Sequence, residues 1–548
     1  HRYWIALLEA IQLGAVLWFE YVSHGTLDYY ADIVVDNFTL IMILIAGVIG
    51  SLIAVFSLGY MEAFQKEHRD VRDRRDFFFF VLFLFLSAMF GLVVSNNLLY
   101  MYTFWEITSV CSFLLIGYTE SRVAVNNSFK ALWMNLLGGA AFAAAIIVMG
   151  LTYHSTALSH LVGLALAGMP VTVILALLLL CGFTKSAMMP FSGWLLGAMV
   201  APTPTSALLH SSTMVKAGVF LIIKLCPALG NNHAGTMAMF VGGITFFFAS
   251  CAAISQSDGK KVLAYSTISN LGLIVCCAGI GSYEAAWTAI MIVIFHAVAK
   301  SLLFLSVGTA EQQLGSRDIE RFDGLFNAMP HLCLCMVIGI SGMFLAPFGM
   351  LISKWAAMKA FIDAGHPMLL LLLVFGSATT IFYWAKWLGK ILSVMNGQER
   401  REQGITKGEW FTLKTLSWMT IIVCILFPLI SSYGVLPYLR ITYGFTRDVI
   451  AQSNLIIMSL MVVLLVILPS RYGKGQPKRK VGALLAGVNT GDDRNYLGAG
   501  DNIIPVELRN WYMEEWFGEK KMKLSGFALC MACIFIQFAI ILGGVYRG

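Results

Sequence analysis

The sequence predicts an all-α integral membrane protein with about 14–15 transmembrane helices. Hydrophobic residues make up 58% of the 548 positions, and only 12% are charged, whereas a soluble domain has roughly 25% charged residues. Apolar runs of about 20 residues, the length that crosses a bilayer, recur along the whole chain. The net charge of +7 is modest and no basic tract is interleaved with aromatics, so lipids and other membrane subunits are expected partners, and nucleic acid is not.

The spans are separated by short connections, so they form one integral domain. The expected ranges are 3–22, 37–59, 76–95, 97–118, 129–152, 170–197, 203–226, 235–256, 262–281, 284–312, 330–358, 366–394, 410–434, 454–469 and 524–545.

The spans fall into four segments, two of which contain the polar stretches of the chain. The segments are 1–75, which ends in a charged loop; 76–256, the first half; 257–435, the second half; and 436–548, with the polar loop 471–523. The stretch Glu62–Asp76 is the other polar one. Each polar stretch is either a solvated loop or a docking surface for partner subunits or lipid head groups.

Two spans look interrupted. Lys185 is followed five residues later by Pro190, and Pro347 and Gly349 precede Lys354 in the second half. Interrupted helices at corresponding places in two halves indicate an inverted-repeat transporter, here with two five-helix repeats. Free backbone groups at a break are tolerated where they line water or protein, which suits a hydrated path.

Several spans carry ionisable residues, which cost on the order of 2.5–3.5 kcal/mol at the centre of a membrane helix. Such residues persist where they are paired, hydrated or used. The candidate proton-translocation residues are Glu106, Lys185, His210, Lys216, His296, Lys300, Lys354 and Lys386. Each could instead be a buried structural group satisfied by a neighbouring helix.

Spacing predicts how two pairs of candidates are arranged. His210 and Lys216 are six residues apart and point in different directions from one helix. The i, i+4 spacing of His296 and Lys300 puts them on one face, where a proton could pass between them directly or through a water.

Lysine suits a switchable proton path, because burial favours its neutral form and a nearby carboxylate favours the ammonium. If Glu106 lies beside Lys185, the carboxylate would hold that lysine protonated until it is withdrawn.

Lysines at span ends have a simpler explanation. Lys390, and to a lesser degree Lys386, are expected to extend to the membrane interface. Lys260 and Lys261 are expected to be surface anchors.

The eleven cysteines lie mostly in apolar runs. Cys530 and Cys533 form a CxxC without a second pair, so small core residues are favoured over a metal or cluster site. No cofactor is expected in this chain.

Four stretches resemble one known family: WEITSVCSFLLIGY, TKSAMMPFSGWLLGAMVAPTPTSALLHSSTMVKAGVFL, KKVLAYSTISNLG and HAVAKSLLFLSVG. They are similar to the antiporter-like subunits of respiratory complex I, of multisubunit Na+/H+ antiporters and of energy-converting [NiFe] hydrogenases, over roughly residues 37–395. The resemblance implies fourteen core helices, two inverted five-helix repeats and a hydrated row of charged residues. It also implies that the family's first helix precedes this sequence.

The resemblance assigns roles by motif. Glu106 matches the buried glutamate of the family and Lys185 the lysine of the first broken helix. His210 and Lys216 match the family's connecting histidine and lysine. Lys300 matches the central lysine of the second half, and His296 lies just before it. Lys354 matches the terminal lysine or glutamate of the second broken helix.

Residues Tyr30–Glu62 resemble the subtype related to the most distal complex I subunit, whereas the C-terminal segment is similar to the large antiporter-like membrane component of energy-converting (Ech-type) hydrogenases. The expected function is therefore ion translocation, of protons or sodium, in the plasma membrane of a prokaryote. The NiFe and Fe–S centres would lie in partner subunits of a peripheral hydrogenase-type module. The alternatives are a component of a Mrp-type antiporter or of complex I, and a purely structural anchor.

Overall fold

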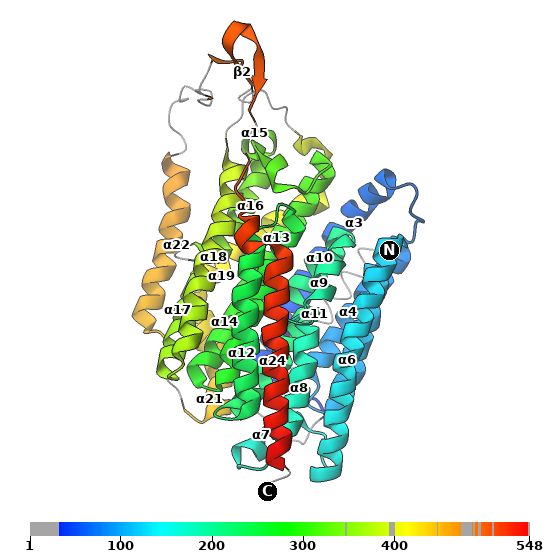
Figure 1. Cartoon of the computed structure of the whole chain (residues 1–548), viewed down its shortest axis with the longest axis vertical. Helices are drawn as coiled ribbons and strands as arrows, with labels where there is room; N and C mark the ends of the chain where they lie inside the picture. Colours follow the sequence, from blue (N-terminus) through cyan, green and yellow to red (C-terminus); the bar gives the residue numbers. More distant parts are fainter. Residues whose placement is uncertain are drawn as a thin grey trace.

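The computed structural model describes residues 32–345, 348–393, 401–445, 448–472, 485, 488–491, 495–506 and 509–545. Helices dominate it and run mostly along its long axis (Figure 1). Among the described residues, 11 helices are long and apolar enough to cross a membrane, or 12 if one bent pair counts as a single span. The prediction of an all-α membrane protein is confirmed.

Most expected ranges correspond to these spans. Two expected ranges, 170–197 and 454–469, instead contain apolar helices shorter than a full span, Thr172–Lys185 and Gln452–Leu464. The expected span 3–22 lies outside the described residues.

The helices up to residue 254 contain the first interrupted span. They are α2 (Asn37–Leu44), η1 (Ile45–Ile49), α3 (Gly50–Glu67), α4 (Arg75–Val94), α5 (Leu98–Ile116), α6 (Arg122–Tyr153), α7 (Leu158–Leu166), α8 (Thr172–Lys185), α9 (Gly193–Gly197), η2 (Ala198–Val200), α10 (Thr203–Ala207), η3 (Leu208–Ser212), α11 (Met214–Leu229) and α12 (His233–Ile254).

The helices after residue 254 contain the second interruption. They are α13 (Gly259–Ile280), α14 (Tyr283–Leu314), η4 (Ile319–Phe322), α15 (Leu325–Ala328), α16 (Pro330–Phe344), α17 (Gly349–Asp363), α18 (Pro367–Leu392), η5 (Glu402–Gly404), α19 (Lys407–Ile425), α20 (Phe427–Leu429), η6 (Ile430–Val435), α21 (Leu436–Tyr443), α22 (Gln452–Tyr472), α23 (Glu514–Phe517) and α24 (Glu519–Val545).

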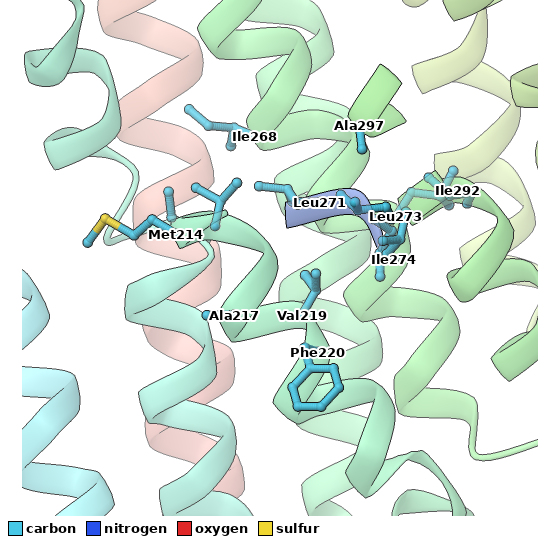
Figure 2. Packing of buried hydrophobic residues seen from close by; sticks show 14 of the residues in the cluster. Met214, Ala217, Val219, Phe220, Ile268, Leu271, Leu273, Ile274, Ile292 and Ala297 are labelled. Carbon is cyan, nitrogen blue, oxygen red and sulfur yellow. The ribbon is translucent and has the colours of Figure 1, made fainter. Parts of the chain in front are cut away.

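Helices α13 and α14 form the centre of the molecule, since their most apolar stretches are wholly buried, whereas α24 buries only 22% of its own. Figure 2 shows apolar side chains from α11, α13 and α14 meeting there. Local signals fix where both helices begin and end. Asp258 and Ser282 cap their N-termini, and Gly281 and Gly315 end them in the left-handed conformation at φ 76° and 66°, which glycine adopts without steric cost.

Glycines also let α12 lie directly against α13. A Cβ on Gly242 would meet the backbone of Gly272 and Cys276, and one on Gly279 would meet the backbone of Gly235 and Met239. Small residues at a helix interface allow this close backbone approach within a membrane.

Both expected interruptions are present. Helix α8 ends at Lys185, ahead of Pro190, and α16 ends at Phe344 before α17 begins at Gly349. Pro347 itself lies outside the described residues. Further irregularities were not expected: the π-helical turns η1, η3 and η6, and a 65° bend between Lys407–Ile425 and Phe427–Tyr443.

Both polar stretches contain regular structure in the parts that the structure describes. Helix α3 continues to Glu67, into the first polar stretch. The second contains a small antiparallel sheet of β1 (Val488–Asn489), β2 (Asn495–Leu497) and β3 (Ile503–Pro505), in the order β1-β2-β3. Figure 1 shows this sheet at the end of the molecule where α3 also ends.

Candidate functional site

Glu106 on α5 and Lys185 on α8 are connected through Ser109. The Lys185 ammonium donates hydrogen bonds to Ser109 Oγ at 2.8 Å and to the Trp105 carbonyl oxygen at 2.9 Å. It also lies 5.0 Å from the centre of the Trp105 ring. Glu106 and Lys185 are close enough to attract each other, but in the described structure the hydrogen bonds of Lys185 go to Ser109 and Trp105.

A glycine pair on α6 gives this cluster its space. A Cβ on Gly139 would meet Oε1 of Glu106, and a Cβ on Gly138 would meet Oγ1 of Thr184. Oε1 of Glu106 is buried and has no hydrogen-bond partner in the described part of the chain. An unpaired buried oxygen costs free energy, so this atom can accept a proton or a hydrogen bond from water.

Trp194 connects the broken end of α8 to η3. Its Nε1 donates to the Thr184 carbonyl oxygen at 2.9 Å, one of the carbonyls that a helix C-terminus leaves without a helical partner. The Trp194 ring centre lies 6.1 Å from that of His210.

His210 lies in the π-helical turn η3 and is fully buried. Its ring sits between Trp194 and Phe304, whose centre is 5.8 Å away. Neither ring nitrogen has a hydrogen-bond partner among the described residues. The neighbouring Ser211 accepts a hydrogen bond of 2.7 Å from Ser301 on α14. Single π-helical turns often mark functional sites.

Lys216 on α11 and His296 on α14 contact each other, with 3.0 Å between Nζ and Nδ1. Both are fully buried, and Nε2 of His296 has no partner in the described structure. As the spacing predicted, Lys216 and His210 point to different neighbours.

Lys300, one turn after His296, points to α13. It donates to the Leu263 carbonyl oxygen at 3.0 Å and to Ser266 Oγ, and lies 5.2 Å from the centre of the Trp384 ring. Among the described residues, the hydrogen-bond partner of His296 is Lys216 on α11 and not Lys300. Proton passage between His296 and Lys300, directly or through a water, stays a prediction.

Lys354 follows the second interruption, on α17. It is 7% exposed, and its ammonium lies 5.7 Å from the centre of the Phe246 ring on α12. Unlike Lys185 and Lys300, it makes no hydrogen bond within the described ranges.

Lys386 on α18 lies beneath the segment that precedes α23. It donates to the carbonyl oxygens of Ile254 at 2.6 Å and Gln256 at 3.3 Å. Its ammonium is 3.9 Å from the centre of the Tyr512 ring. Tyr512 therefore covers Lys386.

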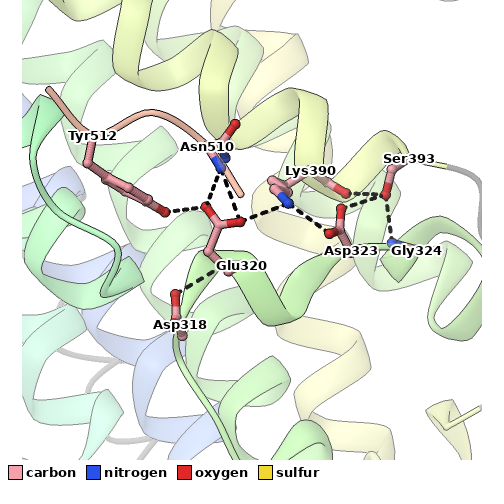
Figure 3. Close-up of polar contacts among 8 residues, drawn as sticks. All are labelled: Asp318, Glu320, Asp323, Gly324, Lys390, Ser393, Asn510 and Tyr512. Atoms are coloured by element: carbon pink, nitrogen blue, oxygen red, sulfur yellow. Dashed lines mark hydrogen bonds and ion pairs between the residues drawn. The ribbon is translucent and has the colours of Figure 1, made fainter. Parts of the chain in front are cut away.

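The same segment is held by Glu320 (Figure 3). Glu320 accepts hydrogen bonds from the Tyr512 hydroxyl at 2.5 Å and the Asn510 backbone N–H at 3.3 Å, and pairs with Lys390 at 2.8 Å. Burial acts to raise the pKa of the Glu320 carboxyl, but the hydrogen bonds and the charge of Lys390 outweigh it and hold that pKa below its usual value.

Two lysines expected at the surface are buried instead. Lys390 is 7% exposed and pairs with both Glu320 and Asp323 at 2.8 Å. Lys260 is 2% exposed and pairs with Glu311 at 2.8 Å. In both places the buried ammonium pairs with carboxylates of the protein instead of extending to the membrane interface.

Sequence reasoning missed several contributing residues. Ser109 lies three residues after Glu106, one helical turn along the same face, and that spacing could have identified it. Trp194, Ser301, Glu320 and Tyr512 gave no such signal, because the partners described above lie 10 or more residues away and not one helical turn along the same face.

Within the described residues, no group of three or more His, Cys, Asp or Glu side chains could hold a metal ion. The cysteines, including Cys530 and Cys533, are free thiols.

Comparison with known proteins defines the class. Residues 95–380 match the family model "NADH:quinone oxidoreductase/Mrp antiporter, TM", and residues 18–70 match "NADH-Ubiquinone oxidoreductase (complex I), chain 5 N-terminus". The chain belongs to this family of antiporter-like membrane subunits and is a multi-pass protein of the plasma membrane.

Individual relatives agree with the family match. The chain is 33% identical over 386 residues to the A1 subunit of the Na(+)/H(+) antiporter of Staphylococcus haemolyticus, covering 66% of this chain and 47% of the relative. The match to the same subunit of Staphylococcus aureus is 33% over 398 residues, covering 68% and 49%. The chain thus spans about half the length of these relatives.

Two solved complexes contain a similar fold. The Mrp complex of Dietzia sp. DQ12-45-1b matches with a TM-score of 0.70 and 25% identity, over 86% of this chain and 54% of that one. An archaeal membrane-bound sulfane sulfur reductase matches with a TM-score of 0.70 and 21% identity, over 84% and 93%.

Proposed function

We propose that this chain is an ion-translocating subunit that moves protons, or alternatively sodium, through the membrane. The proposed path comprises Glu106, Lys185, His210, Lys216, His296, Lys300, Lys354 and Lys386. The observation that carries the proposal is that five of these residues, Lys185, His210, Lys216, His296 and Lys300, have no exposed surface. Ionisable groups buried at membrane depth are expensive and are typical of ion paths.

The Lys216–His296 pair gives the proposed path one defined step. The 3.0 Å between Nζ and Nδ1 is within the range for proton transfer between heavy atoms. A neutral imidazole that accepts a proton at Nδ1 can release one from Nε2, the nitrogen without a partner in the described structure. His296 would then relay protons between α11 and the region of Lys300.

The other residues extend this step into both halves of the chain. In this proposal, residues 76–256 and 257–435 are two antiporter-like halves, each with one interrupted helix. Residues 1–75 and 436–548 flank them. Glu106 and Lys185 would serve the first half, and Lys354 and Lys386 the second.

The proposed driving force is electron transfer in partner subunits. The C-terminal resemblance to the large antiporter-like component of energy-converting hydrogenases favours a redox-driven complex, with its NiFe and Fe–S centres in a peripheral module and none here. The 33% identity to Na(+)/H(+) antiporter subunits favours a second candidate, a Mrp-type antiporter that uses an ion gradient alone. The remaining alternatives are a structural anchor and a complex I subunit.

Replacing one lysine tests the proposed path. In proteoliposomes that hold the complex containing this chain, Lys216→Gln should lower proton uptake about 100-fold, a typical loss for a removed acid–base group. The control is Lys359→Gln, because Lys359 is 37% exposed and pairs with Asp363 on its own helix. If Lys216→Gln assembles normally and retains full uptake, the chain is a structural anchor.

A further inference from the structure

Lys130 on α6 and Lys523 on α24 converge over the segment that follows α8, and neither belongs to the proposed ion path. A Cβ on Gly193 would meet Nζ of Lys130 at 3.0 Å, and a Cβ on Gly526 of α24 would meet Met189. Lys523 lies three residues before Gly526, one turn away on the same side of the helix. Helices α6 and α24 both pack against α8, and Figure 1 shows them on either side of it. The two lysines are close enough for their charges to act on each other.

These two cations lie together without a carboxylate that bridges them. Lys130 is exposed and makes no hydrogen bond or ion pair with any residue that the structure describes. Lys523 is half-buried and has no ion-pair partner in the same described ranges. Glu519 is the carboxylate whose charge acts on Lys523, but it accepts a hydrogen bond of 2.8 Å from Tyr265 and pairs with Lys261 at 3.7 Å. Lys130 and Lys523 therefore repel each other, which an anion between them would relieve.

The surrounding charges favour an anionic partner over a zwitterionic one. Residues 514–523 contain three Lys and three Glu, so this segment is neutral in sum. Lys130 and Lys261, from two other helices, then add two positive charges. A net positive site at a membrane surface attracts anionic lipids, whereas a head group without net charge gains no such attraction.

Both lysines lie at the depth of lipid head groups. Helix α6 has 32 residues, about 48 Å, and Lys130 is about 12 Å from its start. Helix α24 has 27 residues, about 40 Å, and Lys523 is about 6 Å from its start. Each helix is longer than a hydrocarbon core of about 30 Å, so both lysines lie near the edge of that core, where a long side chain reaches the interface.

Apolar side chains next to both lysines face outward. Leu137 lies seven residues after Lys130, two turns further along the same side of α6, and is 41% exposed. Leu524, next to Lys523, is 63% exposed. Helix α24 buries only 22% of its most apolar stretch. These outward faces suit acyl chains below a head group that the lysines hold.

We propose that Lys130 and Lys523 bind the phosphate of one anionic phospholipid, whose acyl chains lie along α6 and α24. Both ammonium groups donate charge-assisted hydrogen bonds to the phosphate oxygens, and the phosphate removes their mutual repulsion. Lys261 adds to the attraction without direct contact. The bound lipid thereby joins α6 to α24 over Met189–Gly193, the segment next to the first interruption.

The test captures the lipid in place. The purified complex carries a photo-crosslinking amino acid at Leu137 and is placed in vesicles of equal phosphatidylglycerol and phosphatidylethanolamine. Both lipids contain a phosphate, but only phosphatidylglycerol has a net negative charge. Irradiation and mass spectrometry of the adducts should show phosphatidylglycerol enriched roughly fivefold over the bulk ratio.

Paired variants separate this site from a general effect of charge. Lys130→Gln, Lys523→Gln should return the adducts to the bulk ratio, whereas Lys130→Arg, Lys523→Arg keeps both charges and should retain the enrichment. The control Lys66→Gln, Arg69→Gln also removes two positive charges from exposed positions. These positions lie on the same side of the membrane as the start of α6, because α4 and α5 cross it once each in between. The control should leave the enrichment unchanged.

Three outcomes would overturn the proposal. Lipid adducts in the bulk ratio in the parent would show that no head group is selected. Enrichment that survives Lys130→Gln, Lys523→Gln would show that other residues select it. Adducts to protein alone would show that a polypeptide covers this place. None of these readouts depends on ion transport, so failure here leaves the proposed function untouched.

Discussion

At the scale of the residue, four of the buried lysines form two pairs that differ in the chemistry of their partners. Lys185 and Lys300 donate to serine hydroxyls and backbone carbonyls. Lys260 and Lys390, outside the proposed path, pair with carboxylates at 2.8 Å. A direct carboxylate favours the charged lysine strongly, whereas a neutral hydroxyl leaves the proton easier to release. The first pair suits transfer and the second suits structure.

Gly139→Ala should disturb Glu106 directly. The new Cβ would meet Oε1 of Glu106, and overpacking of this kind typically costs about 1–3 kcal/mol. We expect a lower melting temperature of the complex and slower ion uptake, measured by thermal unfolding and by the proteoliposome assay.

The control for this prediction is Gly150→Ala on the same helix, where a Cβ would meet nothing within 4 Å. It should be neutral, or stabilising by about 0.5–1 kcal/mol. If both variants behave alike, the Gly139 contact does not hold the Glu106 carboxylate in place.

At the scale of the element, the segment before α24 is held by polar contacts to η4 and α18. Tyr512 and Asn510 both donate to Glu320, and Tyr512 covers Lys386. Trp511, in contrast, is 69% exposed. The hydrogen bonds that Tyr512 and Asn510 donate to η4 therefore both end on the Glu320 carboxylate.

Docking of this segment should depend on pH in a defined direction. Because the pKa of Glu320 is lowered in the docked state, its contribution is fully present above the ordinary glutamate pKa of about 4.3. It is lost as the pH falls through the lowered value. Hydrogen exchange of residues 509–513, corrected for intrinsic rates, should be constant near neutral pH and rise only in acid.

Tyr512→Phe should loosen the same segment at neutral pH. Loss of a partly exposed hydrogen bond to a carboxylate costs about 1–2 kcal/mol, which corresponds to roughly tenfold faster exchange. Tyr433→Phe is the control, since Tyr433 is 76% exposed. Unchanged exchange in Tyr512→Phe would mean that the backbone contacts of Asn510 suffice.

At the scale of the whole molecule, the two proposed functions differ in what drives ion movement, electron transfer in partner subunits or an ion gradient alone. The most apolar stretches of the central helices α13 and α14 are wholly buried, so a change imposed by a partner must reach these stretches through the surrounding helices. Either a redox module or an ion gradient could impose it.

The two drivers predict opposite results in sealed liposomes. For a hydrogenase-type complex, hydrogen with an electron acceptor should energise proton uptake, and a sodium gradient alone should not. The measurement is uptake under each condition with the same preparation. Uptake with the sodium gradient alone, and none with hydrogen, would establish the Mrp-type alternative.

Sequence periodicity and composition anticipated much of the fold. Eleven expected ranges became spans, and the interruption at Lys185 was found where Pro190 indicated it. The turn η3 was missed, since Leu208–Ser212 reads as ordinary apolar helix and no proline or glycine marks it. The sequence identified the candidate residues of the site, because ionisable side chains are rare within apolar spans. It did not identify their contacts.

The sequence by itself determined that the chain crosses a membrane many times and that lysines, histidines and Glu106 lie within its spans. Both properties are local, since the bilayer selects for apolar length and penalises isolated charge. Only the tertiary structure decided that His296 pairs with Lys216 rather than Lys300, that Ser109 separates Glu106 from Lys185, and that Lys390 is buried against Glu320. Such contacts join residues up to 80 positions apart, and they depend on how helices pack, which spacing along one helix cannot encode.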